Sequence, residues 1–337
     1  MVGTRRRSRR WPTQWWTLTL LHHAPGRPPA TPAGYHALSG WLGSFGPVDR
    51  VGVEGTGTYG AGLARHLAAS GITVIEVDRP NRQERRRNGK SDELDAIEAA
   101  RAALSGRATG HAKAATGNVE ALRTLLVAKR SARAIRIKTT GQLRHLVITA
   151  PDDLRVSLSG LTTKALITKA AGLRPRPGAD PVGHAIKTAA VTLARRVQAI
   201  NAEISALDTH IETLVKATAP GLLGVYGVGA DTAAILLAAA GDNAARIRSE
   251  AAWAHLCGVA PIPAGSGKTN GRHRLNPGGN RQANHALWRI VITRLGQREP
   301  RTVAYMQRRL ADGRTKPEII RALKRYVARE IYQQLPT

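Results

Sequence analysis

Residues 50–77 constrain the fold of this chain more than any other stretch. Residues 50–54, RVGVE, predict a short buried strand, residues 59–70 an amphipathic helix and residues 72–77 a second strand. Because the connections are short, the two strands should be parallel and joined by a right-handed crossover. This part of the chain therefore predicts an α/β domain.

Helices are predicted for much of the remaining chain. Ser91 is a suitable N-cap for a helix over residues 91–104, and residues 119–149 predict a long helix with one apolar and one basic side. The apolar side is formed by Leu122, Leu125, Leu126, Ile135 and Leu143. The basic side is formed by Lys129, Arg130, Arg133, Arg136, Lys138 and Arg144.

A further helix is predicted beyond the Pro- and Gly-rich residues 172–183, which indicate a linker. Its apolar residues recur at spacings of four and three, as in one seam of a coiled coil. They are Leu193, Val197, Ile200, Ile204, Leu207, Ile211 and Leu214. Such a seam fits self-association and equally fits a long helix packed on its own domain.

The charge of the chain indicates its class of partner. There are 51 Lys and Arg against 23 Asp and Glu, a net charge of +28, so a polyanion such as nucleic acid is the expected partner. The single cysteine, Cys257, excludes an internal disulfide and suits a reducing cytosol. No apolar stretch reaches membrane-spanning length, so we expect a cytoplasmic protein without a membrane partner.

The glycines after the first strand allow a competing interpretation. Gly55, Gly57 and Gly60 form the dinucleotide-binding pattern G-x-G-x-x-G, with Glu76 or Asp78 available for a ribose. However, the following 90–215 region is mostly helical rather than β-α, and a carboxylate at Glu54 would repel a pyrophosphate. A dinucleotide-binding enzyme is therefore the second choice.

Three carboxylates in this region are candidate metal ligands. Asp92 and Asp95 are three residues apart on a predicted helix and share one face, and Glu54 ends a strand where α/β sheets place their sites. Together they could hold Mg²⁺ for phosphoryl transfer. The alternative is an ordinary solvated helix face, with Asp92 favoured by the helix dipole.

Two C-terminal segments are candidate nucleic-acid contacts. Gly227 and Gly229 lie between apolar helical runs, as in a helix-hairpin-helix, whose turn binds a phosphate through backbone N–H groups. A tight turn without a ligand fits the same residues. Further on, Ser266 lies between glycines near several basic residues, namely Lys268, Arg272, His273, Arg274 and Arg281.

Ser266 is a candidate nucleophile, because neighbouring cations can stabilise the charge of phosphoryl transfer. The neighbouring GSGKT is not a P-loop, since Ile262 occupies the position of the required glycine. A serine in a loop can also be an ordinary turn residue.

Five segments occur in one order: VGVEGTGTYG, KSDELDA, GVYGVGADTA, CGVAPIPAGSGKT and GGNRQANHAL. In this order they resemble the DEDD transposases of the insertion-sequence one-ten family (Piv/MooV-like). The resemblance implies a RuvC-like domain of RNase H type, a helical coiled-coil segment and a mainly α-helical C-terminal transposase domain. It also implies Mg²⁺, DNA, a guide (bridge) RNA and a homo-oligomer, either a dimer or a tetramer.

The resemblance also implies roles for particular residues. Glu54, Asp92 and Asp95 match the second, third and fourth acidic residues, and Ser266 matches the serine that attacks DNA. Asn280 and Arg281, in the last motif, join Gly227, Gly229 and the basic loop residues as expected nucleic-acid contacts. The family's first acidic residue has no counterpart, since residues 1–48 contain no Asp or Glu.

The expected organisation is an atypical basic tail at 1–24, a RuvC-like domain at 25–150 with an incomplete first strand, a linker and coiled-coil helix at 151–215, and a transposase domain at 216–337. The expected function is that of a bacterial insertion-sequence transposase, a nucleoid-associated DNA recombinase whose activity is impaired by the missing carboxylate. The alternative is a non-catalytic nucleic-acid-binding remnant.

Overall fold

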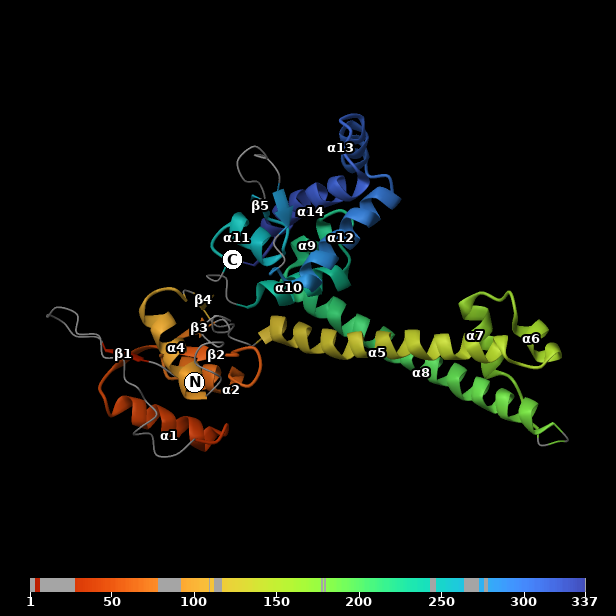
Figure 1. Cartoon of the computed structure of the whole chain (residues 1–337), viewed down its shortest axis with the longest axis horizontal. Coiled ribbons are helices and arrows are strands. Elements are labelled where there is room, and N and C mark those ends of the chain that lie inside the picture. Colours follow the sequence, from red (N-terminus) through yellow and green to blue (C-terminus); the bar gives the residue numbers. More distant parts are fainter. Residues whose placement is uncertain are drawn as a thin grey trace. The chain divides into compact units, whose positions relative to one another are not determined.

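A computed structural model describes residues 4–6, 28–77, 92–108, 110–111, 117–176, 178, 180–242, 247–263, 273–275 and 278–336 (Figure 1). The chain divides into two compact units. Residues 1–120 and 240–252 form the sheet unit, and residues 121–239 and 253–336 form the helical unit.

The sheet unit contains a four-stranded sheet in the order β1-β2-β3-β4. Its elements are β1 (Thr4–Arg6), α1 (Pro32–Gly43), β2 (Val48–Glu54), α2 (Ala61–Ala69), β3 (Thr73–Val77), α4 (Asp92–Leu104) and β4 (Gly110–His111). Strands β2 and β3 are parallel, with Arg50 opposite Thr73 and Glu54 opposite Val77. The predicted β-α-β unit is thus confirmed. Both outer strands, β1 and β4, are antiparallel to their neighbours.

Helices cover both faces of the sheet. Val51 and Val53 point to one face and pack with Leu63 and Leu67 of α2 and Leu42 of α1 in one apolar core. Since side chains alternate along a strand, Gly52 faces the other side.

That other face is covered by α4. A Cβ placed on Gly52 would lie 2.6 Å from the backbone oxygen of Ala99 and 3.2 Å from the Cβ of Ala103. Glycine therefore permits the close approach of α4 to β2. The tight contact fixes α4, and with it the start of the helix at Asp92, relative to the strand that ends at Glu54.

The helical unit begins with two long helices, which cross each other in Figure 1. Its first elements are α5 (Gly117–Ile148, beginning just before the unit), α6 (Asp152–Leu158), α7 (Thr163–Ala171) and α8 (Pro181–Thr218). Ala132 of α5 packs with Ile200 and Ile204 of α8, while Leu143 packs nearer the start of α8, so the pair is antiparallel. Four of the seven seam residues of α8 are buried within the chain and the other three are partly buried; the buried four are Val197, Ile200, Ile204 and Ile211.

Three details differ from the sequence predictions. Lys129, expected on the basic side of α5, has a side chain that is 1% exposed, and Ile135, expected on the apolar side, is 47% exposed. The linker ends at residue 180, because Asp180 caps α8 through the backbone N–H of Gly183. Helices α6 and α7 were not predicted, since each is shorter than three turns of helix.

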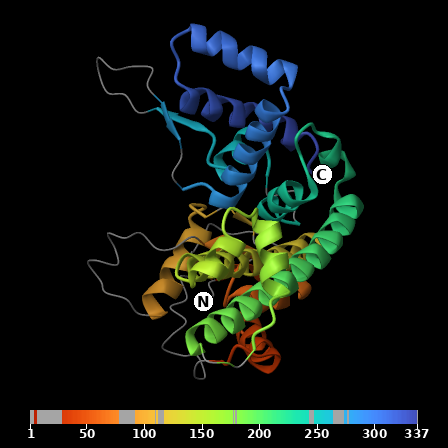
Figure 2. The same ribbon diagram turned by 90° about the vertical axis from the view of Figure 1, so that its right-hand side faces the viewer.

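The remainder of the helical unit is a cluster of shorter helices and one hairpin. Its elements are α9 (Pro220–Gly224), α10 (Ala230–Ala240), α11 (Glu250–Leu256, whose first turn belongs to the sheet unit), β5 (Pro261–Pro263), β6 (His273–Leu275), α12 (Arg281–Gly296), α13 (Pro300–Ala311) and α14 (Lys316–Tyr332). Helices α12, α13 and α14 pack against one another (Figure 2). Within the described residues, no helix is both long and apolar enough to cross a membrane.

Candidate nucleic-acid-processing site

Glu54 is the last residue of β2, and its side chain is partly buried. The chain turns directly after it, because Gly55 has a φ of +68° and its carbonyl accepts hydrogen bonds from the backbone N–H groups of Thr58 and Gly60. A Cβ on Gly60 would lie 2.6 Å from the Glu54 carbonyl oxygen. The two glycines therefore shape a tight turn that holds Glu54 at the carboxyl end of the strand.

Asp92 and Asp95 lie in the first turn of α4, the helix that packs on β2 at Gly52. The positions of their side chains, and the predicted N-cap Ser91, fall outside the described residues. Convergence of these two carboxylates with Glu54 therefore stays a prediction. Among the side chains that are described, no group of three acidic, His or Cys residues forms a metal site.

The glycine turn has a geometry that argues against dinucleotide binding. The described sheet has only two parallel strands, whereas a doubly wound dinucleotide fold needs more. In addition, Thr56 Oγ1 donates a 2.8 Å hydrogen bond to Oε1 of Glu76, one of the two carboxylates suggested for the ribose. The glycine pattern thus serves a strand-to-helix turn.

Besides Glu54, the described strands carry two acidic residues, Asp49 in β2 and Glu76 in β3. Strand β1 pairs with the edge of β2 that faces away from β3, and its three residues are Thr4, Arg5 and Arg6. Asp49 lies five residues before Glu54 in β2, roughly 16 Å away along the strand. It interacts with Arg50, with 3.1 Å between the Arg50 Nε and the Asp49 carboxylate.

Ser266, Lys268 and Arg272 lie outside the described residues, between the strands of a short hairpin. Strand β5 pairs with β6 in antiparallel register, with Pro263 opposite His273 and Ile262 opposite Arg274. The side chains of His273 and Arg274 are not described. The observed hairpin defines the two ends of the segment that carries the candidate serine.

The base of this hairpin is anchored to α12. Asn284 Nδ2 donates hydrogen bonds of 3.0 Å to the carbonyls of both Cys257 and Gly258. The Asn284 Oδ1 accepts a hydrogen bond of 2.8 Å from the Nζ of Lys324. A Cβ on Gly279 would lie 2.3 Å from the Cα of Gly258, so the two backbone segments meet at glycines. Asn284, which the sequence analysis did not single out, thus ties three parts of the helical unit together.

Asn280 has a structural function at the start of α12. Its Oδ1 accepts hydrogen bonds from the backbone N–H groups of Gln282, at 3.0 Å, and Ala283, at 3.1 Å, which makes it the N-cap. Arg281, the first residue of the helix, is exposed. The cap explains why Asn stands at this position without requiring a nucleic acid.

The predicted glycine turn lies between α9 and α10. Gly227 has a φ of +79°, and Gly229 exchanges hydrogen bonds with Thr232: its N–H donates to Oγ1 at 3.1 Å and its carbonyl accepts from the same hydroxyl at 2.9 Å. The turn between two helices is confirmed. Thr232 satisfies one of the N–H groups that a phosphate would otherwise bind.

Immediately after this turn, Asp231 forms the centre of a charge cluster that sequence reasoning missed. Its carboxylate accepts hydrogen bonds from Lys129 at 2.6 Å, from Arg133 at 3.1 Å and from Arg289. Lys129 also contacts Asp208. We call these five residues the Asp231 cluster, which joins α5, α8, α10 and α12.

The Asp231 cluster is an internal, largely neutralised network. Burial alone would raise the pKa of Asp231, but the hydrogen bonds from Arg289 and Lys129 and the charges of Lys129 and Arg133 outweigh it and hold the pKa well below its ordinary value. The carboxylate thus stays ionised and fixes cations that a charge count would assign to nucleic acid. Burial raises the pKa of the Cys257 thiol, which leaves it protonated and unreactive.

Comparison with known proteins assigns both parts of the chain to one family. A transposase family model for IS110 DEDD enzymes matches residues 20–150, and a model described as transposase IS116/IS110/IS902 family matches residues 220–307. A Streptomyces coelicolor protein, described as insertion element IS110 uncharacterized 43.6 kDa protein, is 30% identical over 136 residues.

That alignment covers 40% of this chain and 33% of the Streptomyces protein, so the match spans about a third of the relative's length. The two family models match the chain in the same order as the motifs identified in the sequence. The resemblance to the insertion-sequence one-ten family is therefore confirmed. The fold is a DEDD transposase domain, of the RuvC-like fold family, followed by a mainly helical C-terminal region. The chain belongs to the IS110 family of transposases.

Proposed function

We propose that this chain is a DNA transposase that cuts and rejoins strands through Ser266. The observation that carries the proposal is the presence of both family matches on one chain, the first including Glu54, Asp92 and Asp95 and the second including Ser266. A carboxylate set and a serine in a basic loop are together suited to phosphoryl transfer on DNA.

The proposed reaction conserves the energy of the DNA linkage. The Ser266 hydroxyl oxygen attacks a DNA phosphorus, the bond from that phosphorus to the deoxyribose oxygen breaks, and the serine proton is transferred to the leaving oxygen. A hydroxyl from another strand then attacks the serine phosphodiester, which restores a DNA phosphodiester and returns the proton to the serine. The cations expected near Ser266, Lys268 and Arg272 among them, stabilise the negative charge of both transition states.

Glu54, Asp92 and Asp95 are the residues that would hold a divalent metal ion, and we propose Mg²⁺. Carboxylate oxygens are the ligands this hard cation prefers, and Glu54 lies at the carboxyl end of β2, where α/β folds place their sites. The ion would supply charge stabilisation at the scissile phosphate. Glu54 would contribute a ligand held by the Gly55 turn, and α4 would bring the other two.

The proposed partners are DNA, a guide RNA and further copies of the chain, in the bacterial cytoplasm near the nucleoid. The net charge of +28 supports polyanion binding. The turn at Gly227 and Gly229 is proposed as a helix-hairpin-helix phosphate contact. Self-association through a coiled coil would need a surface other than the buried positions of α8, since Ile200, Ile204 and Ile211 already pack inside the chain.

A second function, nucleic-acid binding without catalysis, is favoured by one specific observation. The strand that pairs with the outer edge of β2 carries no carboxylate, and Asp49 lies at the opposite end of β2 from Glu54. The proposed ion would then have one ligand fewer, which weakens its binding.

A covalent-trapping experiment separates the two functions. The purified chain is incubated with Mg²⁺, guide RNA and nicked DNA carrying its insertion-sequence ends, and covalent protein–DNA complexes are detected in denaturing gels. We expect an adduct with the unchanged chain, its loss in Ser266→Ala, and its retention in Ser205→Ala, an exposed serine of α8. An adduct that survives Ser266→Ala contradicts the serine assignment. Salt-sensitive binding without any adduct supports the non-catalytic alternative.

A further inference from the structure

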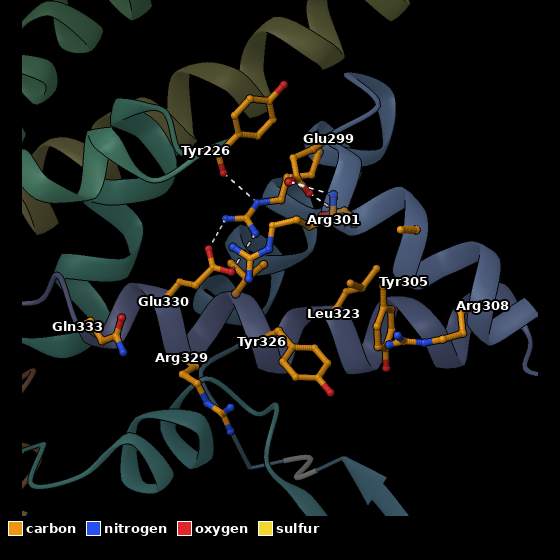
Figure 3. Close-up of a pocket in the computed structure, with 14 residues that line it drawn as sticks. Tyr226, Glu299, Arg301, Tyr305, Arg308, Leu323, Tyr326, Arg329, Glu330 and Gln333 are labelled. Atoms are coloured by element: carbon orange, nitrogen blue, oxygen red, sulfur yellow. Dashed lines mark hydrogen bonds and ion pairs between the residues drawn. The ribbon is translucent and has the colours of Figure 1, made fainter.

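A pocket of about 740 Å³ lies between α12, α13 and α14 within the helical unit (Figure 3). Its lining contains four arginines, three tyrosines and two glutamates. Its arginines are Arg294, Arg301, Arg308 and Arg329, and its tyrosines are Tyr226, Tyr305 and Tyr326. Only Tyr226 belongs to a motif that indicated the family, GVYGVGADTA.

Both glutamates of the pocket are engaged by the protein itself. Glu299 caps α13 by accepting hydrogen bonds from the backbone N–H groups of Arg301, at 3.2 Å, and Thr302, at 2.7 Å. Glu330 pairs with Arg294, with 2.7 Å between Nη2 and Oε2, and Arg294 also donates to the Tyr226 carbonyl. Arg294 is therefore neutralised, and with four arginines against two glutamates the pocket keeps an excess of positive charge.

Tyr305, Arg308, Tyr326 and Arg329 form what we call the Arg-Tyr platform. Tyr305 and Arg308 are three residues apart on α13, and Tyr326 and Arg329 are three apart on α14, so each pair shares a helix face. The rings of Tyr305 and Tyr326 meet edge to face, with centroids 5.4 Å apart, and the Arg308 guanidinium lies 5.5 Å from the Tyr305 centroid. The two helices thus place two rings side by side with a cation on each helix.

Exposure makes this platform available to a ligand. The Tyr326 side chain is 47% exposed, a large value for an aromatic residue with a ring neighbour. In Figure 3 the Tyr326 ring and the Arg329 side chain lie on one side of α14, whereas the Tyr226 ring points away from the group. Tyr226 therefore contributes its carbonyl to Arg294 rather than its ring to the platform.

The charges along α14 also favour an anionic ligand. Burial and the charge of its neighbour Arg329 lower the pKa of Arg325. Like charges one helix turn apart repel each other. Phosphate groups near this face would relieve the repulsion.

We propose that the Arg-Tyr platform binds an unpaired nucleotide of a nucleic-acid strand, its base stacked on Tyr326 and its phosphates near Arg308 and Arg329. Aromatic faces beside cations are the elements with which proteins hold single strands without reading their sequence. A base inside a duplex has no free face to offer, so the platform selects unpaired segments. The inference rests on the proposed nucleic-acid function and adds a site at the end of, and beyond, the family match at 220–307.

The test measures binding of the full chain to labelled single-stranded DNA, single-stranded RNA and duplex DNA by fluorescence anisotropy. Stacking of one base contributes about 1–3 kcal/mol, so Tyr326→Ala should weaken single-strand binding about tenfold to hundredfold. Duplex binding should change less than about twofold, and Tyr326→Phe should bind like the unchanged chain. If Tyr326→Ala weakens binding of single-stranded RNA more than binding of single-stranded DNA, the ligand is RNA; the opposite result identifies DNA.

Arg308→Ala and Arg309→Ala are a matched pair, because Arg309 is the next residue along α13 and is already paired with Asp312 at 2.8 Å. The slope of the logarithm of the single-strand binding constant against the logarithm of the salt concentration should become shallower in Arg308→Ala, by about the amount that one phosphate contact contributes. Arg309→Ala should change this slope less. Tyr326→Leu keeps an apolar side chain but has no ring on which a base can stack. Circular dichroism of each variant shows whether it is folded, so that lost stacking can be separated from lost folding.

The proposal is overturned if Tyr326→Ala, while folded, binds single strands as the unchanged chain does, or if single-strand and duplex binding fall equally. In either case the proposed transposase function stands. If the unchanged chain binds no nucleic acid at all, the proposed function itself fails.

Discussion

The two units of this chain handle charged side chains in different ways. In the sheet unit, Glu54 is positioned by the end of a strand and by the glycine turn that follows it. In the helical unit, Asp231 is held by three cations from two other helices. The first arrangement follows from local backbone geometry, whereas the second requires the assembled fold.

This difference corrects a simple reading of the net charge. Lys129, Arg133 and Arg289 are directed at Asp231, and Arg294 at Glu330, so these cations stabilise the fold. Arg308 of the Arg-Tyr platform is instead exposed and lies over the Tyr305 ring. A basic composition indicates nucleic-acid binding only through the cations that the fold leaves to a partner.

The largest effect is expected for Asp231→Ala, which leaves Lys129 buried with one acidic partner, Asp208. Breaking a buried ion pair costs about 3–5 kcal/mol, and because Arg133 and Arg289 are partly exposed we expect about 3 kcal/mol. Urea unfolding followed by fluorescence, with Trp253 as a buried probe in the same unit, measures the change.

Asp312→Ala is the matched control, because Asp312 forms an exposed pair with Arg309. Removal of an exposed pair costs about 0–1 kcal/mol. If the two variants unfold at the same urea concentration, the Asp231 cluster contributes no more than a surface pair, and the contrast between the units disappears.

The same cluster predicts a pH dependence. The pKa of Asp231 is lowered in the folded chain, so its stabilisation is complete above the ordinary Asp pKa of about 3.9 and is lost as the pH falls towards the folded value. The difference in unfolding free energy between the unchanged chain and Asp231→Asn should be constant from pH 7 to 5 and should narrow below pH 4. Urea titrations at pH 7, 5, 4 and 3.5 test this. A difference that widens on acidification contradicts the lowered pKa.

An intermediate effect is expected for Gly52→Ala in the sheet unit. The new methyl group would lie 2.6 Å from the backbone oxygen of Ala99, and overpacking of this kind costs about 1–3 kcal/mol. Gly57→Ala is the control, because no atom lies within 4 Å of its Cβ position. Thermal unfolding should separate the two variants, and a Gly52→Ala chain as stable as Gly57→Ala would show that α4 does not depend on this contact.

The sequence predicted those features that depend on nearby residues. The β-α-β unit, the turn at Gly227, the extent of α5 and the existence of α8 follow from local periodicity and turn residues. The burial of Lys129 could not be predicted, because its partner Asp231 is 102 residues away. The platform was missed because Tyr305 and Tyr326 meet through packing of two helices, without a sequence motif. For Asp92, Asp95 and Ser266 the predictions still rest on sequence.

The smallest effect is expected for Asn280→Ala, and it distinguishes two explanations of one residue. Asn280 caps α12 through Gln282 and Ala283, and loss of an N-cap costs about 1 kcal/mol. Asn280→Ser should keep most of this stability, because a serine side chain can cap the same helix.

If Asn280 serves only as the cap, both variants bind nucleic acid like the unchanged chain once the measurement is made well below their unfolding temperatures. If Asn280 also contacts nucleic acid, Asn280→Ser stays stable but binds more weakly, and anisotropy at constant salt detects the difference. The second result would extend the nucleic-acid surface of the helical unit to the start of α12, beside the hairpin whose connection carries Ser266.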